Sequence, residues 1–171
     1  MLPHAAVVAA LLALAPYSRA RPQPGWAETQ DQYEARLAGV AADVEAVAAN
    51  STEVAYLLGI AWHESGFALD VQVGPCVGTH AGRCDGGRAR GPWQLHGASS
   101  EATLREQAAL ALRRVRASVH QCAGNPPGER LAAYASGRCD RGLGAARELE
   151  SSVVRARSEL ARAVEAERRR E

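Results

Sequence analysis

The stretch Asn50–Phe67, NSTEVAYLLGIAWHESGF, decides the fold of this chain. Asn50 is suited to cap the start of a helix, and Glu53, three residues later, completes a capping box. Residues 54–62 are almost wholly apolar, so the helix can bury most of its surface. A Ser-Gly pair then ends it. The sequence therefore predicts a buried helix that carries an ionisable residue, Glu64, in its last turn.

Helical periodicity continues through most of the chain. Apolar residues recur at spacings of three and four, which is typical of a helix with one buried face. The segments with this pattern, besides the central helix, are 31–48, 100–120, 129–136 and 143–164. Residues 165–171 are so highly charged that we expect them to fray. These patterns predict an all-α fold.

Residues 70–98 depart from the helical pattern, with glycine at seven positions and two of the four cysteines. Gly-dense segments build loops or small β-hairpins, because glycine adopts backbone angles that are closed to other residues. We expect a disulfide-closed loop or small hairpin here. Since this segment directly follows the Glu64 helix, it is placed to form a wall or roof over a cleft beside that carboxylate.

The length of 171 residues favours a single domain, which would bury roughly two thirds of its unfolded surface. The formal net charge is +1, and every basic side chain apart from histidine is arginine. Without Arg19, which lies in a predicted leader, 19 arginines face 19 acidic residues. This balance argues against a general nucleic-acid binder, which would carry a clear basic excess.

Residues 1–20, MLPHAAVVAALLALAPYSRA, have the pattern of a cleaved secretion signal. Their apolar core, residues 5–15, is too short to cross a bilayer as a helix. Ser18 and Ala20 are the small residues that a signal peptidase requires. The alternative is a retained helix that anchors the chain or packs in the fold. Cleavage predicts export to the periplasm or the medium, without stable membrane insertion of the mature chain.

The even number of cysteines supports export, because exported chains usually pair them in disulfides. Three pairings of four cysteines are possible, and we favour Cys76 with Cys84 and Cys122 with Cys139. The competing hypothesis is a metal site built from the first two cysteines and a histidine, one of His63, His80 and His96. Zinc sites prefer closer ligand pairs than these, so we predict no metal and no other cofactor.

The position of Glu64 predicts an unusual carboxyl group. The last turn of a helix faces the negative end of the helix dipole, and shielding by Trp62, Phe67 and Trp93 would disfavour the charged form further. Both effects raise the pKa. A Glu that stays protonated near neutral pH is what a general acid for glycosidic bond cleavage requires. The alternative is an exposed carboxylate without a task.

Three short motifs follow one another along the chain, namely Glu64-Ser65-Gly66-Phe67, Gly91-Pro92-Trp93-Gln94-Leu95 and Ala133-Tyr134-Ala135-Ser136-Gly137. Together they resemble the signature of the soluble lytic transglycosylase family of the lysozyme-like superfamily. That family has an ES dipeptide at a helix end, a GxxQ segment and an AYNxG segment. The resemblance covers residues 50–145. It implies a lysozyme-like catalytic domain there, and outside it lie the predicted leader at 1–20, a helical segment at 21–49 and a charged helix at 146–171.

The resemblance implies that Glu64 is the single catalytic acid/base and that Ser65 supports the cleft. It implies that Gln94 forms hydrogen bonds in the site and that Tyr134 lies close to Glu64. Trp93 could stack on a sugar ring or could belong to the core, with equal support for each. The implied reaction is cleavage of the β-1,4 bond between N-acetylmuramic acid and N-acetylglucosamine in peptidoglycan. The product carries a 1,6-anhydro end, and one carboxylate suffices, unlike the usual pair.

Two departures from the family pattern concern the substrate cleft. Pro92 and Trp93 stand in place of the usual Leu-Met, and Ala135 replaces the usual Asn. A hydrogen bond made by that amide is therefore missing or is supplied by Ser136. These changes put glycan specificity in question more than the fold.

Two other functions stay open. A lysozyme of the goose type shares the fold and hydrolyses the same bond, with an added acid that positions water; Asp70 and Asp85 are the candidates. The second alternative is a non-catalytic peptidoglycan-binding or structural module, which the altered motifs would support and the intact Glu64 opposes. We expect a monomer whose partner is the glycan strand. His63 points about 100° away from Glu64 around the helix and is not a second catalyst.

Overall fold

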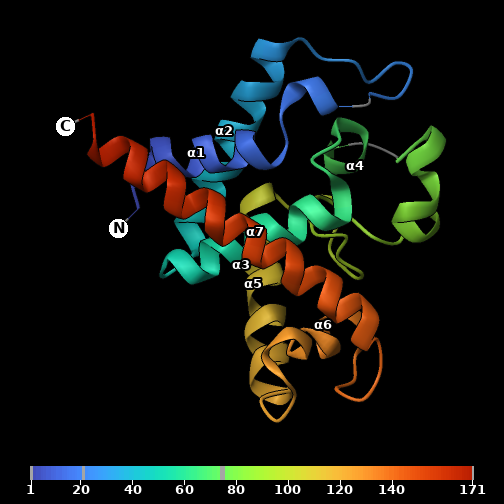
Figure 1. Ribbon diagram of the computed structural model, residues 1–171. Coiled ribbons are helices and arrows are strands. Elements are labelled where there is room, and N and C mark those ends of the chain that lie inside the picture. Colours follow the sequence, from blue (N-terminus) through green and yellow to red (C-terminus); the bar gives the residue numbers. More distant parts are fainter. Residues whose placement is uncertain (1, 21, 74–75, 171) are drawn as a thin grey trace.

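The computed structural model describes residues 2–20, 22–73 and 76–170. These residues form helices and turns without a strand, so the predicted mainly α fold is confirmed (Figure 1). The α-helices are α1 (His4–Leu14), α2 (Gln30–Val47), α3 (Ser51–Ser65), α4 (Leu69–Val73), α5 (Leu104–Gln121), α6 (Ala132–Ser136) and α7 (Leu143–Arg168). Short 3₁₀ segments lie between them: η1 (Tyr17–Arg19), η2 (Gly78–Gly87) and η3 (Pro127–Glu129).

Helix α3 begins at the predicted cap. The side chain of Asn50 accepts a hydrogen bond of 3.0 Å from the backbone N–H of Glu53. The reciprocal half of the predicted capping box does not form as expected, because the Glu53 carboxylate accepts the N–H of Ala49 instead, at 2.7 Å. The same carboxylate also accepts two hydrogen bonds of 2.8 Å from the guanidinium of Arg116. Glu53 therefore ties the start of α3 to α5.

Helix α7 lies across α3 and α1, as the red ribbon in Figure 1 shows. The crossing with α3 is very close at Gly59, where a Cβ atom would lie 2.6 Å from the Cα of Val153. Only glycine lets the two backbones approach in this way. Helices α2, α3, α5 and α7 contribute to the same hydrophobic core, so the segments 21–49 and 146–171 pack with residues 50–145.

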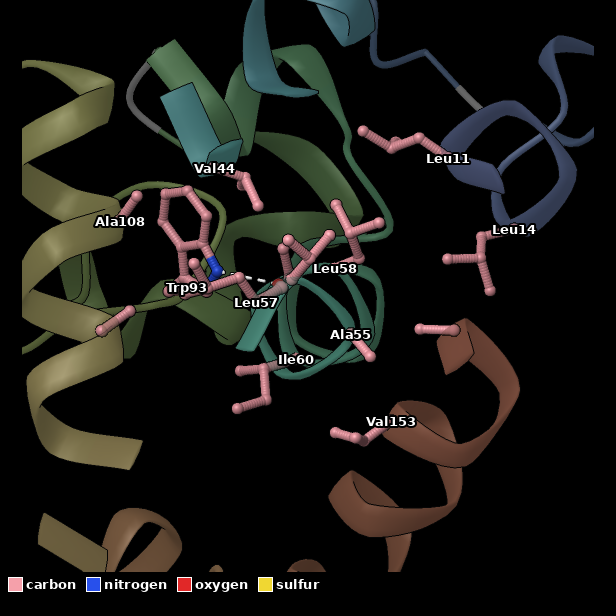
Figure 2. Close-up of a cluster of buried hydrophobic side chains, with 14 of the residues drawn as sticks. Leu11, Leu14, Val44, Ala55, Leu57, Leu58, Ile60, Trp93, Ala108 and Val153 are labelled. Atoms are coloured by element: carbon pink, nitrogen blue, oxygen red, sulfur yellow. Dashed lines mark hydrogen bonds between the residues drawn. The ribbon is translucent and has the colours of Figure 1, made fainter. Parts of the chain in front are cut away.

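Helix α1 packs in this core. Leu11 and Leu14 are buried, and Figure 2 shows both directed toward the cluster that contains Leu58. The buried phenol of Tyr33 on α2 donates a hydrogen bond of 2.6 Å to the carbonyl of Ala15. In the uncut chain, residues 4–14 thus form a helix that packs in the fold, which is the alternative to a cleaved secretion signal. Cleavage after Ala20 stays a prediction. In the described part of the chain, no helix is long and apolar enough to span a membrane.

The Gly-rich segment after α3 folds as helical turns. Helix α4 and η2 take up much of it, and the alternative of a small hairpin is wrong for residues 76–98, which contain no strand. Both predicted disulfides are confirmed: Cys76 pairs with Cys84 and Cys122 with Cys139, with Cα separations of 6.2 and 5.3 Å. The first closes the turn around η2, and the second joins the end of α5 to the turn after α6.

Three helix boundaries differ from the prediction. The helix expected at 100–120 begins only at Leu104, after a cap at Thr103. The helix expected at 129–136 is divided into η3 and α6. The fraying expected from residue 165 does not occur before Arg168, where α7 ends. Ion pairs one turn apart, such as Arg169 with Glu165 at 3.0 Å, stabilise this charged end.

Candidate functional site

Glu64 lies in the last turn of α3, as predicted, and its side chain is half-buried. Within the part of the chain that the structure describes, no hydrogen bond or ion pair holds its carboxyl group. Burial raises the pKa of Glu64 above its ordinary value of 4.5. The predicted direction is thus confirmed, with desolvation as the cause. A carboxyl group that is desolvated yet unpaired is free to exchange a proton with a ligand.

The turn after Glu64 has an unusual backbone. Gly66 caps α3 in the left-handed region with φ of 57°, and Phe67 follows in the same region with φ of 55°. The buried hydroxyl of Ser65 donates 2.7 Å to the carbonyl of Ala61 and accepts 3.0 Å from the N–H of Phe67. Ser65 therefore supports the end of the helix from within, and its hydroxyl is engaged with the backbone.

Trp93 belongs to the core, and the hypothesis that it stacks on a sugar ring is wrong for this structure. Its side chain is 1% exposed, so neither ring face can meet a ligand. Its indole N–H donates a hydrogen bond of 2.9 Å to the carbonyl of Leu57, shown as a dashed line in Figure 2. The second motif is thus anchored directly to α3. The burial of Trp93 could not be predicted from the sequence, because this residue lies in the Gly-rich segment that lacks the helical pattern.

Gln94 has a constrained conformation. Its backbone is left-handed with φ of 46°, and its side-chain amide donates 2.9 Å to the carbonyl of Gly91. The Oε1 atom of Gln94 is buried and lacks a hydrogen-bond partner in the described structure. Buried carbonyl oxygens are nearly always paired, so this atom is suited to accept a hydrogen bond from a ligand. That property agrees with the role that the resemblance implies for Gln94.

Tyr134 joins the third motif to the other two. Its hydroxyl donates a hydrogen bond of 3.2 Å to the carbonyl of Trp93, and its backbone N–H donates 2.9 Å to the hydroxyl of Ser118. Burial raises the pKa of the Tyr134 phenol, and the nearby Glu64 carboxylate raises it further. Tyr134 therefore lies close enough to Glu64 to interact with its charge.

The residues that replace the family's Asn do not supply an equivalent amide. Ala135 is exposed. The hydroxyl of Ser136 lies 2.9 Å from the carbonyl of Ala132 and 3.0 Å from that of Arg141. Ser136 is thus engaged in the turn between α6 and α7. The hydrogen bond of the missing amide is not made by this neighbour.

The acids considered for positioning water are both engaged elsewhere. Asp70 is buried, with one oxygen 2.8 Å from Nδ1 of His80 and the other accepting 3.1 Å from the N–H of Val77. Asp85 is exposed and pairs with His96 at 2.9 Å. Neither acid is unpaired as Glu64 is.

Two remaining expectations concern histidine and metal. His63 is exposed, and its Nδ1 lies 3.4 Å from the hydroxyl of Ser152. The alternative metal site needs the thiolates of Cys76 and Cys84, and these sulfurs are joined in a disulfide. That alternative is therefore excluded.

A cavity of about 440 Å³ lies beside the turn that follows α3. It is lined by Tyr17, Arg19, Trp26, Tyr33 and His80, together with residues 65–69. The lining does not include Glu64, Gln94 or Tyr134. It is therefore not a cleft over the candidate carboxyl group, and it is partly closed by the end of the predicted leader.

No protein-family model matches the chain, and no curated protein or solved structure matches it either. The case for a function thus depends on the side chains that the fold brings together. Those are Glu64 and Tyr134, which lie close enough to interact through charge, while Gln94 directly follows Trp93, whose carbonyl accepts the hydrogen bond of the Tyr134 hydroxyl.

Proposed function

We propose that this protein is a peptidoglycan lytic transglycosylase whose single acid/base is Glu64. The observation that carries the proposal is the state of that carboxyl group, which is half-buried, unpaired and raised in pKa beside Tyr134. The resemblance of the three motifs gives the substrate class, the bond between N-acetylmuramic acid and N-acetylglucosamine. The contacts of Trp93 with Leu57 and Tyr134 link those motifs in space, which supports treating them as one site.

The proposed reaction has two proton transfers by one residue. Protonated Glu64 donates to the glycosidic oxygen as the bond from C1 of the muramic acid to that oxygen breaks. The substrate's own N-acetyl oxygen stabilises the electron-poor C1. Glu64, now a carboxylate, takes the proton of the C6 hydroxyl while O6 bonds to C1. The product is a 1,6-anhydro ring, no water is consumed, and Glu64 returns to its protonated form.

A group with this task needs a pKa between that of an ordinary carboxyl and neutral pH. Burial of Glu64 shifts its pKa in this direction. The amide of Gln94, with its unpaired oxygen, is placed by the resemblance to hold a polar group of the sugar. The two disulfides support the proposal that the protein works in an oxidising compartment, outside the cytoplasm.

The test is digestion of purified peptidoglycan by the oxidised full chain, with mass analysis of the released muropeptides. The active protein releases anhydro ends, and Glu64→Gln releases none while it keeps its fold. Glu150→Gln is a matched control, because burial also raises the pKa of Glu150 but this residue belongs to none of the motifs. Reducing ends would identify a hydrolase. Binding to sacculi without release would identify a non-catalytic module.

A further inference from the structure

Arg36 on α2 connects four separate segments of the chain, although no motif points to it. Its guanidinium forms a paired contact with the carboxylate of Glu28, in which Nε lies 2.9 Å from Oε2. It also donates 2.5 Å to the side-chain oxygen of Gln72 on α4 and 3.0 Å to the carbonyl of Phe67. Only about 12% of its side chain is exposed. A guanidinium that is so enclosed and so fully engaged holds its partners in fixed positions.

The contact with Phe67 is the important one, because that residue is strained. A bulky non-glycine residue with φ of 55° persists only where its surroundings force it there. Three constraints act on Phe67. Its ring is completely buried, its N–H is bonded by the Ser65 hydroxyl, and its carbonyl is bonded by Arg36. The Ser65 bond arises at the helix end itself, whereas Arg36 acts on the Phe67 carbonyl from another element, α2.

The strained turn lies directly after the helical turn that carries Glu64. Phe67 is three residues beyond Glu64, and the only residues between them are Ser65 and Gly66. If Phe67 relaxed out of the left-handed region, the last turn of α3 would be free to unwind or rotate. Glu64 has no hydrogen bond of its own to keep its carboxyl in place within the described structure. Its position therefore depends on the backbone that carries it.

We propose that Arg36 is a positioning residue for Glu64, which acts through the carbonyl of Phe67, with Glu28 holding the guanidinium in place. The inference rests on the proposed function, since it assigns Arg36 a part in the same reaction. Arg36 does not touch the reacting atoms. Its effect is to keep the acid in the geometry that proton transfer requires, where a displacement of about 1 Å can cost on the order of 100-fold in rate.

The test compares Arg36→Gln, Arg36→Lys and Glu28→Gln in the oxidised full chain, with Arg105→Gln as control. Arg105 forms an exposed ion pair with Asp43 at 3.1 Å and serves to measure the loss of an ordinary surface pair. For Arg36→Gln we expect kcat to fall by roughly 10-fold or more with KM nearly unchanged. Arg36→Lys keeps a cation that can reach the Phe67 carbonyl, so it restores part of kcat. Glu28→Gln tests whether Glu28 holds the Arg36 guanidinium in place, without removing the guanidinium itself.

A second readout does not depend on activity. In protein labelled with ¹³C at the Glu side-chain carboxyls, NMR titration follows the protonation of Glu64. With Arg36→Gln, loosening of the turn hydrates the carboxyl and moves its titration to lower pH, whereas Arg105→Gln leaves it in place. The pH profile of kcat should move in the same direction.

The possible results separate this inference from the proposed function. If the wild-type protein releases no muropeptides, the proposed function fails, and the titration of Glu64 still tests whether Arg36 positions Glu64. If the wild type is active and both Arg36 variants match Arg105→Gln in kcat and in the titration of Glu64, the positioning role of Arg36 is refuted. Should Arg36→Gln fail to fold, Arg36→Lys and Glu28→Gln decide: unchanged kcat and titration in both would refute the inference.

Discussion

The hydroxyl of Tyr134 donates a hydrogen bond to the carbonyl of Trp93, and the indole of Trp93 in turn donates to Leu57 of α3. Residues more than 70 positions apart in the chain are thus joined by two hydrogen bonds, one buried and one partly buried. Because Glu64 lies two helical turns beyond Leu57 on the same side of α3, this chain of contacts holds α6 next to the carboxyl group. The relationship makes Tyr134 and Trp93 structural supports of the site.

Tyr134→Phe should weaken both the support and the activity. The substitution removes one hydrogen bond, which costs about 1 kcal/mol of unfolding free energy. It also removes a hydroxyl group that lies close enough to Glu64 to interact with its charge. We expect a small fall in stability in denaturant unfolding and a larger fall in muropeptide release. Tyr56→Phe, at a half-buried tyrosine on α3, is the control and should leave release unchanged. Equal release by Tyr134→Phe and Tyr56→Phe would show that this hydroxyl has no part in the site.

Trp93→Ala separates the core role from sugar stacking. A core tryptophan costs about 3–5 kcal/mol when truncated, so the midpoint of unfolding should fall steeply. A stacking residue would lose affinity for glycan with little change in stability. Trp93→Phe keeps most of the volume but not the bond to Leu57, and it should be intermediate in stability. Unchanged unfolding of both variants would contradict the buried position.

The sequence was sufficient for the elements that depend on local pattern. The cap at Asn50 forms because its side chain needs only the backbone N–H of Glu53, three residues away. The position of Glu64 and its raised pKa follow from one apolar helix. The role of Arg36 could not be predicted, because its partners lie 8, 31 and 36 residues away. Its only signal is its place between Tyr33 and Leu37, on the edge of a buried stripe.

Gly59→Ala should separate α3 from α7. The added methyl would lie 2.6 Å from the Cα of Val153, and a backbone atom cannot yield as a flexible side chain does. We expect a loss of several kcal/mol, or about 1–3 kcal/mol if the helices can move apart. Gly39→Ala is the matched control, because a Cβ there meets nothing within 4 Å and the site is an exposed position in α2. Gly39→Ala should be neutral or stabilising. Similar melting temperatures for the two variants would contradict the close crossing.

Leu11→Asp should destabilise the uncut chain strongly, because Leu11 is completely buried in the core. A carboxylate at that position has no partner, and we expect a cost of roughly 3 kcal/mol or more. Ala9→Asp places the same group on the exposed face of α1 and should have little effect. Thermal unfolding of both variants checks this. The mass of the exported protein decides separately whether residues 1–20 are retained, and equal unfolding of the two variants would show that α1 is not a core helix in solution.

Glu64→Gln should make the protein more stable at neutral pH and have little effect in acid. Burial raises the pKa of Glu64 in the folded state, so the folded protein holds this proton more tightly than the unfolded chain does. The resulting stabilisation is fully present below the ordinary pKa of 4.5 and is lost as the pH rises through the folded value. Above that value, ionised Glu64 is a desolvated charge without a partner, and the neutral amide avoids its cost.

Each tenfold increase in the proton affinity of Glu64 on folding corresponds to about 1.4 kcal/mol. Denaturant unfolding at pH 4 and pH 7 should therefore show a difference between Glu64→Gln and wild type that grows with pH. Glu148→Gln, at an exposed carboxyl of α7, is the control for the loss of one surface charge. A Glu64→Gln protein that is less stable than wild type at pH 7 would mean that the ionised carboxylate helps to hold the fold, which is the opposite of a group kept ready for proton transfer.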